Sequence, residues 1–133
     1  MSGRARTPTT STTSPPPDVL PSLDGRVFDM ASSTASRVDP DAPTRFAYHE
    51  ADGVVWGEYR GDTVREGRFV GVRRLGRIDV SFVHALVAGS VVSGAATSRI
   101  EADPDRPGAV RLVEDFEVEG TGHRSVCVEV RSR

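Results

Sequence analysis

Two ionisable residues occupy positions where the surrounding sequence pattern calls for apolar side chains. The stretch RIDVSFVHAL, residues 77–86, alternates in the manner of a half-buried β-strand, and the apolar face that contains Phe82 continues at His84. In residues 109–118 the apolar face contains Glu114. A buried carboxyl group beside aromatic rings has a raised pKa, and a nearby histidine would favour its charged form. The two residues are therefore predicted to perform general acid–base catalysis or to orient a ligand.

Aromatic side chains fall on the same predicted faces. The predicted cavity lining combines them with the two ionisable groups: Phe46, Tyr48, Phe82, His84, Glu114 and Phe116. Residues 54–60 are ambiguous, because Trp56 and Glu58 share one face and the residues between them the other. We count Trp56 and Glu58 among the ligand-binding candidates and leave open which face points inward. Apolar walls with a few convergent polar groups are typical of ligand cavities.

Plainer interpretations of these residues stay open. A histidine or glutamate near a strand end is often solvated, or is a structural group with a satisfied hydrogen bond. Cys127 alternates with apolar neighbours and is predicted to be a packing residue, while His49 and His123 are predicted to lie at the surface. No group of His, Cys or carboxylate residues has the spacing of a metal site, so we expect neither a metal nor another cofactor.

The composition excludes several kinds of chemistry. All 17 basic residues are arginine, which rules out Schiff-base, P-loop and Ser–Lys catalysis. The single cysteine rules out an internal disulfide. The net charge of −2 is scattered, and no apolar run suits a membrane span or a signal peptide. We expect a cytoplasmic protein that binds neither nucleic acid nor membrane, and the arginine-only usage indicates a high-GC genome such as an actinobacterial one.

The chain reads as short strands joined by turns. Eight segments have β character, at approximately residues 25–33, 44–51, 54–60, 63–73, 77–85, 90–100, 109–118 and 123–131. This pattern predicts an all-β, eight-stranded antiparallel up-and-down barrel over residues 24–131, lipocalin- or calycin-like, because closure removes exposed sheet edges. A two-sheet sandwich is the alternative. Residues 1–20 are rich in Thr, Ser and Pro and are expected to form a disordered tail.

The chain also resembles a family of small bacterial proteins often labelled "N-acetylglutamate synthase". The matching residues, in order along the chain, are Phe46, Tyr48, Val55, Trp56, Glu58, Tyr59, Gly61, Gly67, Phe69, Gly71, Ile78, Asp79, Phe82, His84, Arg111, Leu112, Glu114 and Phe116. The resemblance covers about residues 24–131 and implies a small barrel of lipocalin- or fatty-acid-binding-like architecture. Gly57, Val80, Phe116 and Val118 are smaller than the residues typical of that family. Residues 73–78, RRLGRI, match the pyrophosphate loop of acetyltransferases only partly and lead into a strand, so acetyl transfer is not predicted.

Three functions are compatible with the predicted lining. The first is a cofactor-independent cyclase or isomerase of actinobacterial secondary metabolism, in which His84 or Glu114 moves a proton. The second is a non-catalytic carrier of a small apolar or aromatic molecule. The third is a filled structural or partner-binding barrel. The sequence leaves open whether the protein is an enzyme, which ligand it binds and whether it forms a homodimer.

Overall fold

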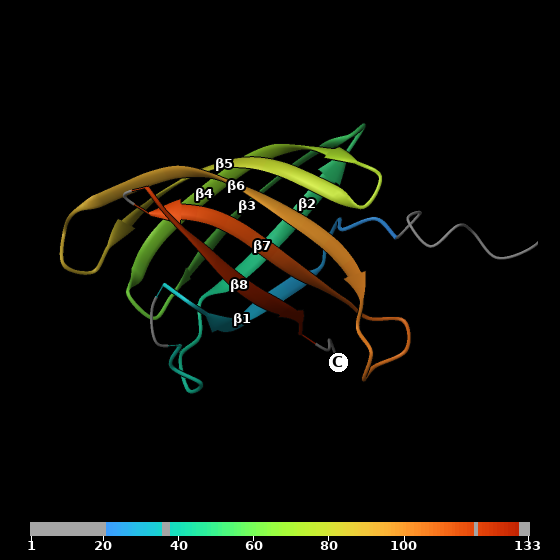
Figure 1. Ribbon diagram of the computed structural model, residues 1–133, viewed down its shortest axis with the longest axis horizontal. Helices are drawn as coiled ribbons and strands as arrows, with labels where there is room; N and C mark the ends of the chain where they lie inside the picture. The colour runs from blue at the N-terminus through green and yellow to red at the C-terminus, as the bar shows by residue number, and fades with distance from the viewer. Residues whose placement is uncertain (1–20, 36–37, 119, 131–133) are drawn as a thin grey trace, which may run out of the picture.

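The chain folds into a closed antiparallel barrel. The computed structural model describes residues 21–35, 38–118 and 120–130, and this part of the chain contains no helix that could cross a membrane. Its eight strands are β1 (Val27–Ser33), β2 (Arg45–Ala51), β3 (Val54–Gly61), β4 (Val64–Arg74), β5 (Arg77–Leu86), β6 (Val91–Ala102), β7 (Val110–Val118) and β8 (Thr121–Glu129). Each strand pairs with the next, and β8 pairs with β1 (Figure 1). The predicted barrel is confirmed, while the predicted tail, residues 1–20, lies outside the described residues.

The turn between β2 and β3 follows directly from its sequence. Asp52 and Gly53 have φ values of 53° and 80°. A two-residue hairpin with positive φ at both positions is a type I′ turn, which fits the right-handed twist of the flanking strands. The turn sets the register of the hairpin, in which His49 pairs with Trp56. Because directly opposed residues share one face of a sheet, His49 and Trp56 lie on the same side.

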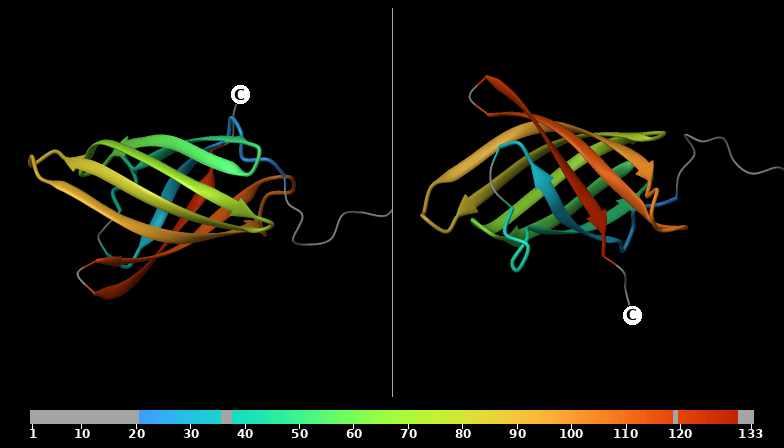
Figure 2. Two further views of the ribbon diagram at one scale, coloured as in Figure 1. Left: turned by 90° about the horizontal axis from the view of Figure 1, so that it is seen from above. Right: turned by 60° about the horizontal axis from the view of Figure 1, so that its bottom comes forward.

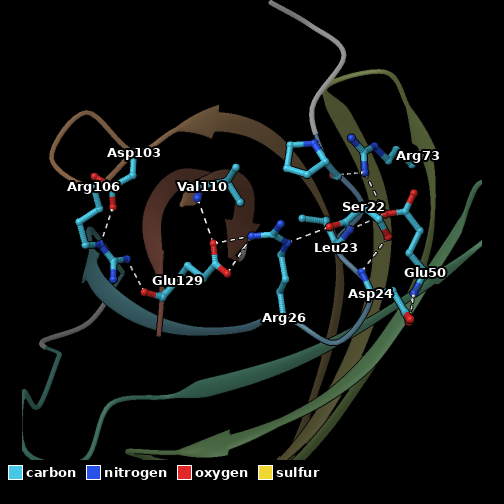
Figure 3. Close-up of polar contacts among 11 residues, drawn as sticks. Ser22, Leu23, Asp24, Arg26, Glu50, Arg73, Asp103, Arg106, Val110 and Glu129 are labelled. Carbon is cyan, nitrogen blue, oxygen red and sulfur yellow. Dashed lines mark hydrogen bonds and ion pairs between the residues drawn. The ribbon is translucent and has the colours of Figure 1, made fainter. Parts of the chain in front are cut away.

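One end of the barrel is closed by the segment that precedes β1. We call residues 21–26 the plug. Leu23, at its centre, is 0% exposed and belongs to the same buried cluster as Phe28 and Ile78. The Leu23 N–H donates to Glu50 Oε1 over 2.8 Å (Figure 3). The Gly25 N–H donates to the Tyr48 carbonyl over 2.9 Å. The plug therefore covers the core with its own backbone groups hydrogen-bonded.

Two arginine side chains hold the plug in place. Arg73 Nη1 donates to the Pro21 carbonyl over 2.9 Å and to Glu50 Oε1 over 2.8 Å. Arg26, within the plug, donates through Nη1 to both carboxylate oxygens of Glu129 at 2.8 Å (Figure 3). The Arg73 and Glu50 side chains are only 10% and 15% exposed, so each charge depends on its partner. Removal of one partner from such a pair leaves an uncompensated charge and is strongly destabilising.

The plug predicts a large cost for Leu23→Ala. Truncation should lower the free energy of unfolding by about 2–5 kcal/mol, because it removes buried apolar area and leaves a cavity under the plug. Leu75→Ala makes the same chemical change at a residue that is 65% exposed. That control should shift stability by less than about 0.5 kcal/mol. Urea denaturation of both variants measures the difference, and equal effects would mean that the plug is not part of the folding core.

Candidate functional site

The interior of the barrel is hollow between the plug and the opposite end. A cavity of about 650 Å³ opens toward the β3–β4 and β5–β6 turns, and it narrows toward Tyr48, Phe69 and Val80. The structure brings all six residues of the predicted lining to this cavity: Phe46, Tyr48, Phe82, His84, Glu114 and Phe116. Their roles in binding or catalysis stay predictions. Tyr59 and Phe69 also line the cavity and were not among the predicted site residues.

Trp56 and Glu58 lie on the outer face of β3, which corrects the expectation that they contribute to the lining. Trp56 is 40% exposed and stacks on His49 with ring centroids 5.6 Å apart. Glu58 Oε1 lies 3.1 Å from Nε2 of the same histidine. The inner face of β3 is instead formed by Val55, Gly57 and Tyr59, and of these Tyr59 reaches the cavity. Trp56 is larger than its neighbour Gly57, but the inner face of β3 at Gly57 is covered by the ring of Phe69 from β4.

Glycines on the strands allow aromatic rings to lie against the barrel wall. Gly67 pairs with Tyr59 across β3 and β4, and a Cβ added to this glycine would lie within 2.7 Å of three atoms of the Tyr59 ring. Phe69 covers Gly57 in the same way, where the added Cβ would lie 2.6 Å from the ring. Phe82 covers Gly94 on β6, at 2.9 Å. The rings therefore occupy the space that side chains on the glycines would take, and the centre of the barrel stays open.

His84 is hydrogen-bonded to a tyrosine, and no carboxylate among the described residues is its partner. Tyr59 Oη lies 2.7 Å from His84 Nδ1, and the two rings meet edge to face. Burial lowers the pKa of His84 below its usual 6.5, and burial together with the charge of Glu114 raises the pKa of Tyr59. The tyrosine thus keeps its proton and can donate it to a neutral imidazole, which leaves Nε2–H as the free donor of His84. At Nδ1, the partner of His84 is therefore a neutral phenol.

Glu114 brings a partly buried carboxyl group into the cavity. Ser98 Oγ donates to its Oε2 over 3.3 Å, and Ser125 Oγ donates to its Oε1 over 3.5 Å. Burial raises the pKa of Glu114, and the two serine hydroxyls offset only part of that rise. Both hydrogen bonds are long, so the carboxyl group retains capacity to accept hydrogen bonds from a ligand. Among the described residues, no group of His, Cys, Asp and Glu is arranged to hold a metal ion.

The barrel wall is incomplete beside β6. The β6–β7 pairing begins only at Ala96, so residues 91–95 have no partner on that side. Figure 2 shows the β7–β8 hairpin diverging from the β5–β6 hairpin at this end of the barrel. A surface cleft lies along the gap and shares Val80, Phe116 and Glu117 with the cavity. The interior is therefore accessible from the open end and from this side.

Comparison with known proteins identifies a family for the barrel. Residues 21–130 match the model of a family described as "Avidin-like protein", which includes the plug and all eight strands. No curated protein and no solved structure matches the chain. The family match agrees with the small barrel that the sequence resemblance implied. It does not carry the label "N-acetylglutamate synthase".

The contact between Gly67 and the Tyr59 ring predicts a specific effect for Gly67→Ala. The new methyl group would push the ring off the wall, at a cost of about 1–3 kcal/mol in the free energy of unfolding. It would also move the Tyr59 hydroxyl away from His84, which NMR of the imidazole protons can detect. Gly122→Ala is the matched control, because a Cβ at this strand position meets nothing within 4 Å. If both variants unfold alike and leave the His84 signals unchanged, the ring does not depend on the glycine.

Proposed function

We propose that this chain, which belongs to the avidin-like protein family, binds a small apolar or aromatic molecule inside its barrel. The observation that carries the proposal is the placement of the aromatic rings across glycines of neighbouring strands. A barrel with a purely structural interior would fill its centre with side chains, as small eight-stranded barrels commonly do. Here the rings form walls, and the cavity of about 650 Å³ lies within the range of small-molecule sites.

The polar groups of the cavity suit the orientation of such a ligand. His84 and Tyr59 lie toward the open end, and Glu114 lies deeper, between β6 and β8. An apolar molecule that carries a hydrogen-bond donor at one end would place it on Glu114. The same molecule could accept a hydrogen bond from His84 at its other end. Polar groups at fixed positions in an apolar pocket supply orientation and specificity.

Acid–base catalysis is the second candidate function, of the cyclase or isomerase type. It is favoured by the pair of groups whose pKa values are moved toward one another: burial raises that of Glu114 and lowers that of His84. Groups of this kind can exchange protons with a substrate near neutral pH. Glu114 would act as the base, and the Nε2–H of His84 would stabilise negative charge that develops on the substrate.

The biological setting is also a proposal. We propose a cytoplasmic protein of a high-GC, actinobacterial type of genome, in which residues 24–131 form one β-barrel domain. The proposed partner is the small-molecule ligand, and neither nucleic acid nor a membrane is proposed. Measurement of the oligomeric state in solution would show whether the protein forms a homodimer.

Ligand binding in the cavity predicts a difference between two matched tryptophan variants. N-phenyl-1-naphthylamine, a neutral dye that fluoresces in apolar surroundings, should bind the parent protein. Val92→Trp narrows the cavity opposite His84 and should weaken dye binding about tenfold, or ~1.4 kcal/mol. Val83→Trp makes the same change on the outer face, where Val83 is 45% exposed, and should bind dye like the parent. No dye binding by the parent, or equal binding by both variants, would rule out a cavity that takes apolar molecules.

The catalytic candidate can be tested with 5-nitrobenzisoxazole, a general probe of base catalysis. A base removes the C3 proton while the N–O bond breaks, and the electron pair of that bond passes to the oxygen to give 2-cyano-4-nitrophenolate. The parent should accelerate this reaction, with a rate that rises as pH rises through the raised pKa of Glu114. Glu114→Gln should reduce the rate about 10²-fold. Glu58→Gln on the outer face should not change it, and an unchanged rate in Glu114→Gln would leave binding as the function.

A further inference from the structure

The ionisable groups of the cavity are acidic or neutral. Its lining includes Asp62, Glu114 and Glu117, and its one histidine is kept neutral at neutral pH by the lowered pKa that burial causes. None of the arginines in the described part of the chain lines the cavity. Several of them lie instead in ion pairs on the outer face, such as Arg45 with Asp29 and Arg124 with Asp115. Among the described residues, the acidic groups that line the cavity therefore have no arginine beside them in the lining.

Glu114 is the deepest of the acidic groups, and the groups that face it carry no positive charge. Ser98 on β6 and Ser125 on β8 contact it through neutral hydroxyls. The titratable groups around it are Tyr48 on β2, Tyr59 on β3 and Cys127 on β8, and burial raises the pKa of each, so all three are uncharged. Asp115, its neighbour in sequence, adds repulsion. A buried carboxylate without a cationic partner is costly, and a cation supplied by the ligand would offset that cost.

The aromatic walls suit the apolar body of such a ligand. Tyr59 lies across Gly67, so one face of its ring rests on β4 and the other is stacked by Phe46 at a centroid distance of 4.8 Å. Phe82 is similarly placed over Gly94 and stacks with His84. With both faces covered, these rings present apolar edges that can pack against a hydrocarbon or aromatic body. A cavity rich in such rings and in carboxylates suits an organic cation.

We propose that the ligand of this cavity is a protonated amine on an apolar or aromatic body, with its ammonium group on Glu114 and its body between the aromatic walls. The inference rests on the proposed function, since it names the chemistry of the ligand for the same cavity. An anionic ligand would meet carboxylates with no arginine to offset them. A neutral ligand would offer Glu114 no counter-charge.

The proposal fixes the direction of the pH dependence. In the empty cavity burial favours the neutral acid of Glu114, because its pKa is raised. An ammonium group favours the carboxylate, so the affinity for an amine increases as pH rises through the folded pKa of Glu114 and levels off above it. The affinity for a neutral alcohol of the same shape lacks this increase, because the alcohol can hydrogen-bond to either form.

The test uses three probes with the same ring and different charges: 1-naphthylmethylamine, 1-naphthylmethanol and 1-naphthoate. Isothermal titration calorimetry on the full chain, from the ordinary glutamate pKa of 4.5 up to about pH 8, compares the parent, Glu114→Gln and Glu58→Gln. The parent should bind the amine about tenfold more tightly than the alcohol, with naphthoate weakest. Glu114→Gln should remove that tenfold preference and its pH dependence while it keeps the affinity for the alcohol. Glu58→Gln should behave like the parent.

Two results would overturn the inference, and they are distinguishable. If the alcohol binds as tightly as the amine, or if Glu114→Gln leaves the preference for the amine intact, the proposed cationic ligand is wrong. The proposed small-molecule binding would then be unaffected. If none of the three probes binds and N-phenyl-1-naphthylamine does not bind either, both the cation and the proposed function are wrong. Circular dichroism of Glu114→Gln shows whether the variant keeps its fold. Retained affinity for the alcohol is a second check, because it requires a folded barrel.

Discussion

The structure depends on the pairing of an aromatic ring with a glycine on the adjacent strand. Glycine weakens a strand, because it loses more conformational freedom on folding and has no side chain to pack. The ring of Tyr59 over Gly67, or of Phe69 over Gly57, restores the lost contact from the neighbouring strand. The arrangement moves bulk from the centre of the barrel to its wall. Strands β2 to β6 can therefore enclose the cavity while aromatic rings still cover the inner surface of the sheet.

The two ends of the barrel have opposite physical character. At the plug, buried polar groups are paired: Arg73 with Glu50, and Arg26 with Glu129. These ion pairs lose hydration and contribute little net stability over an apolar replacement, but they require one geometry for the plug. In the cavity, by contrast, Glu114 has two long hydrogen bonds to serines and no charged partner among the described residues. Polar groups that are left incompletely satisfied are characteristic of binding and catalytic sites, where a ligand completes them.

The inward-facing residues could be predicted from the sequence on strands where apolar and polar residues alternate unambiguously. In β5 and β7 the apolar face is continuous, and His84 and Glu114 could be placed on inner faces from that pattern alone. In β3 the inner face contains Gly57 and the outer face contains Trp56, so the two faces are similarly apolar in sequence. Alternation alone therefore could not identify the inner face. The inward position of Tyr59 depends on its register with Gly67, which a single strand does not contain.

Other features could not be read from one strand or one motif. The hydrogen bond between Tyr59 and His84 joins residues on β3 and β5, and both of them pair with Gly67 of β4, so their approach depends on the register of three strands. Leu23 lies between Ser22 and Asp24, just before the predicted start of the domain at residue 24, and outside any alternating pattern that would mark it as core. Its burial arises from the open end of a barrel that must be covered. Closure of the sheet thus creates both features: a plug at one end, and at the other a hollow whose carboxylates have been separated from the arginines outside.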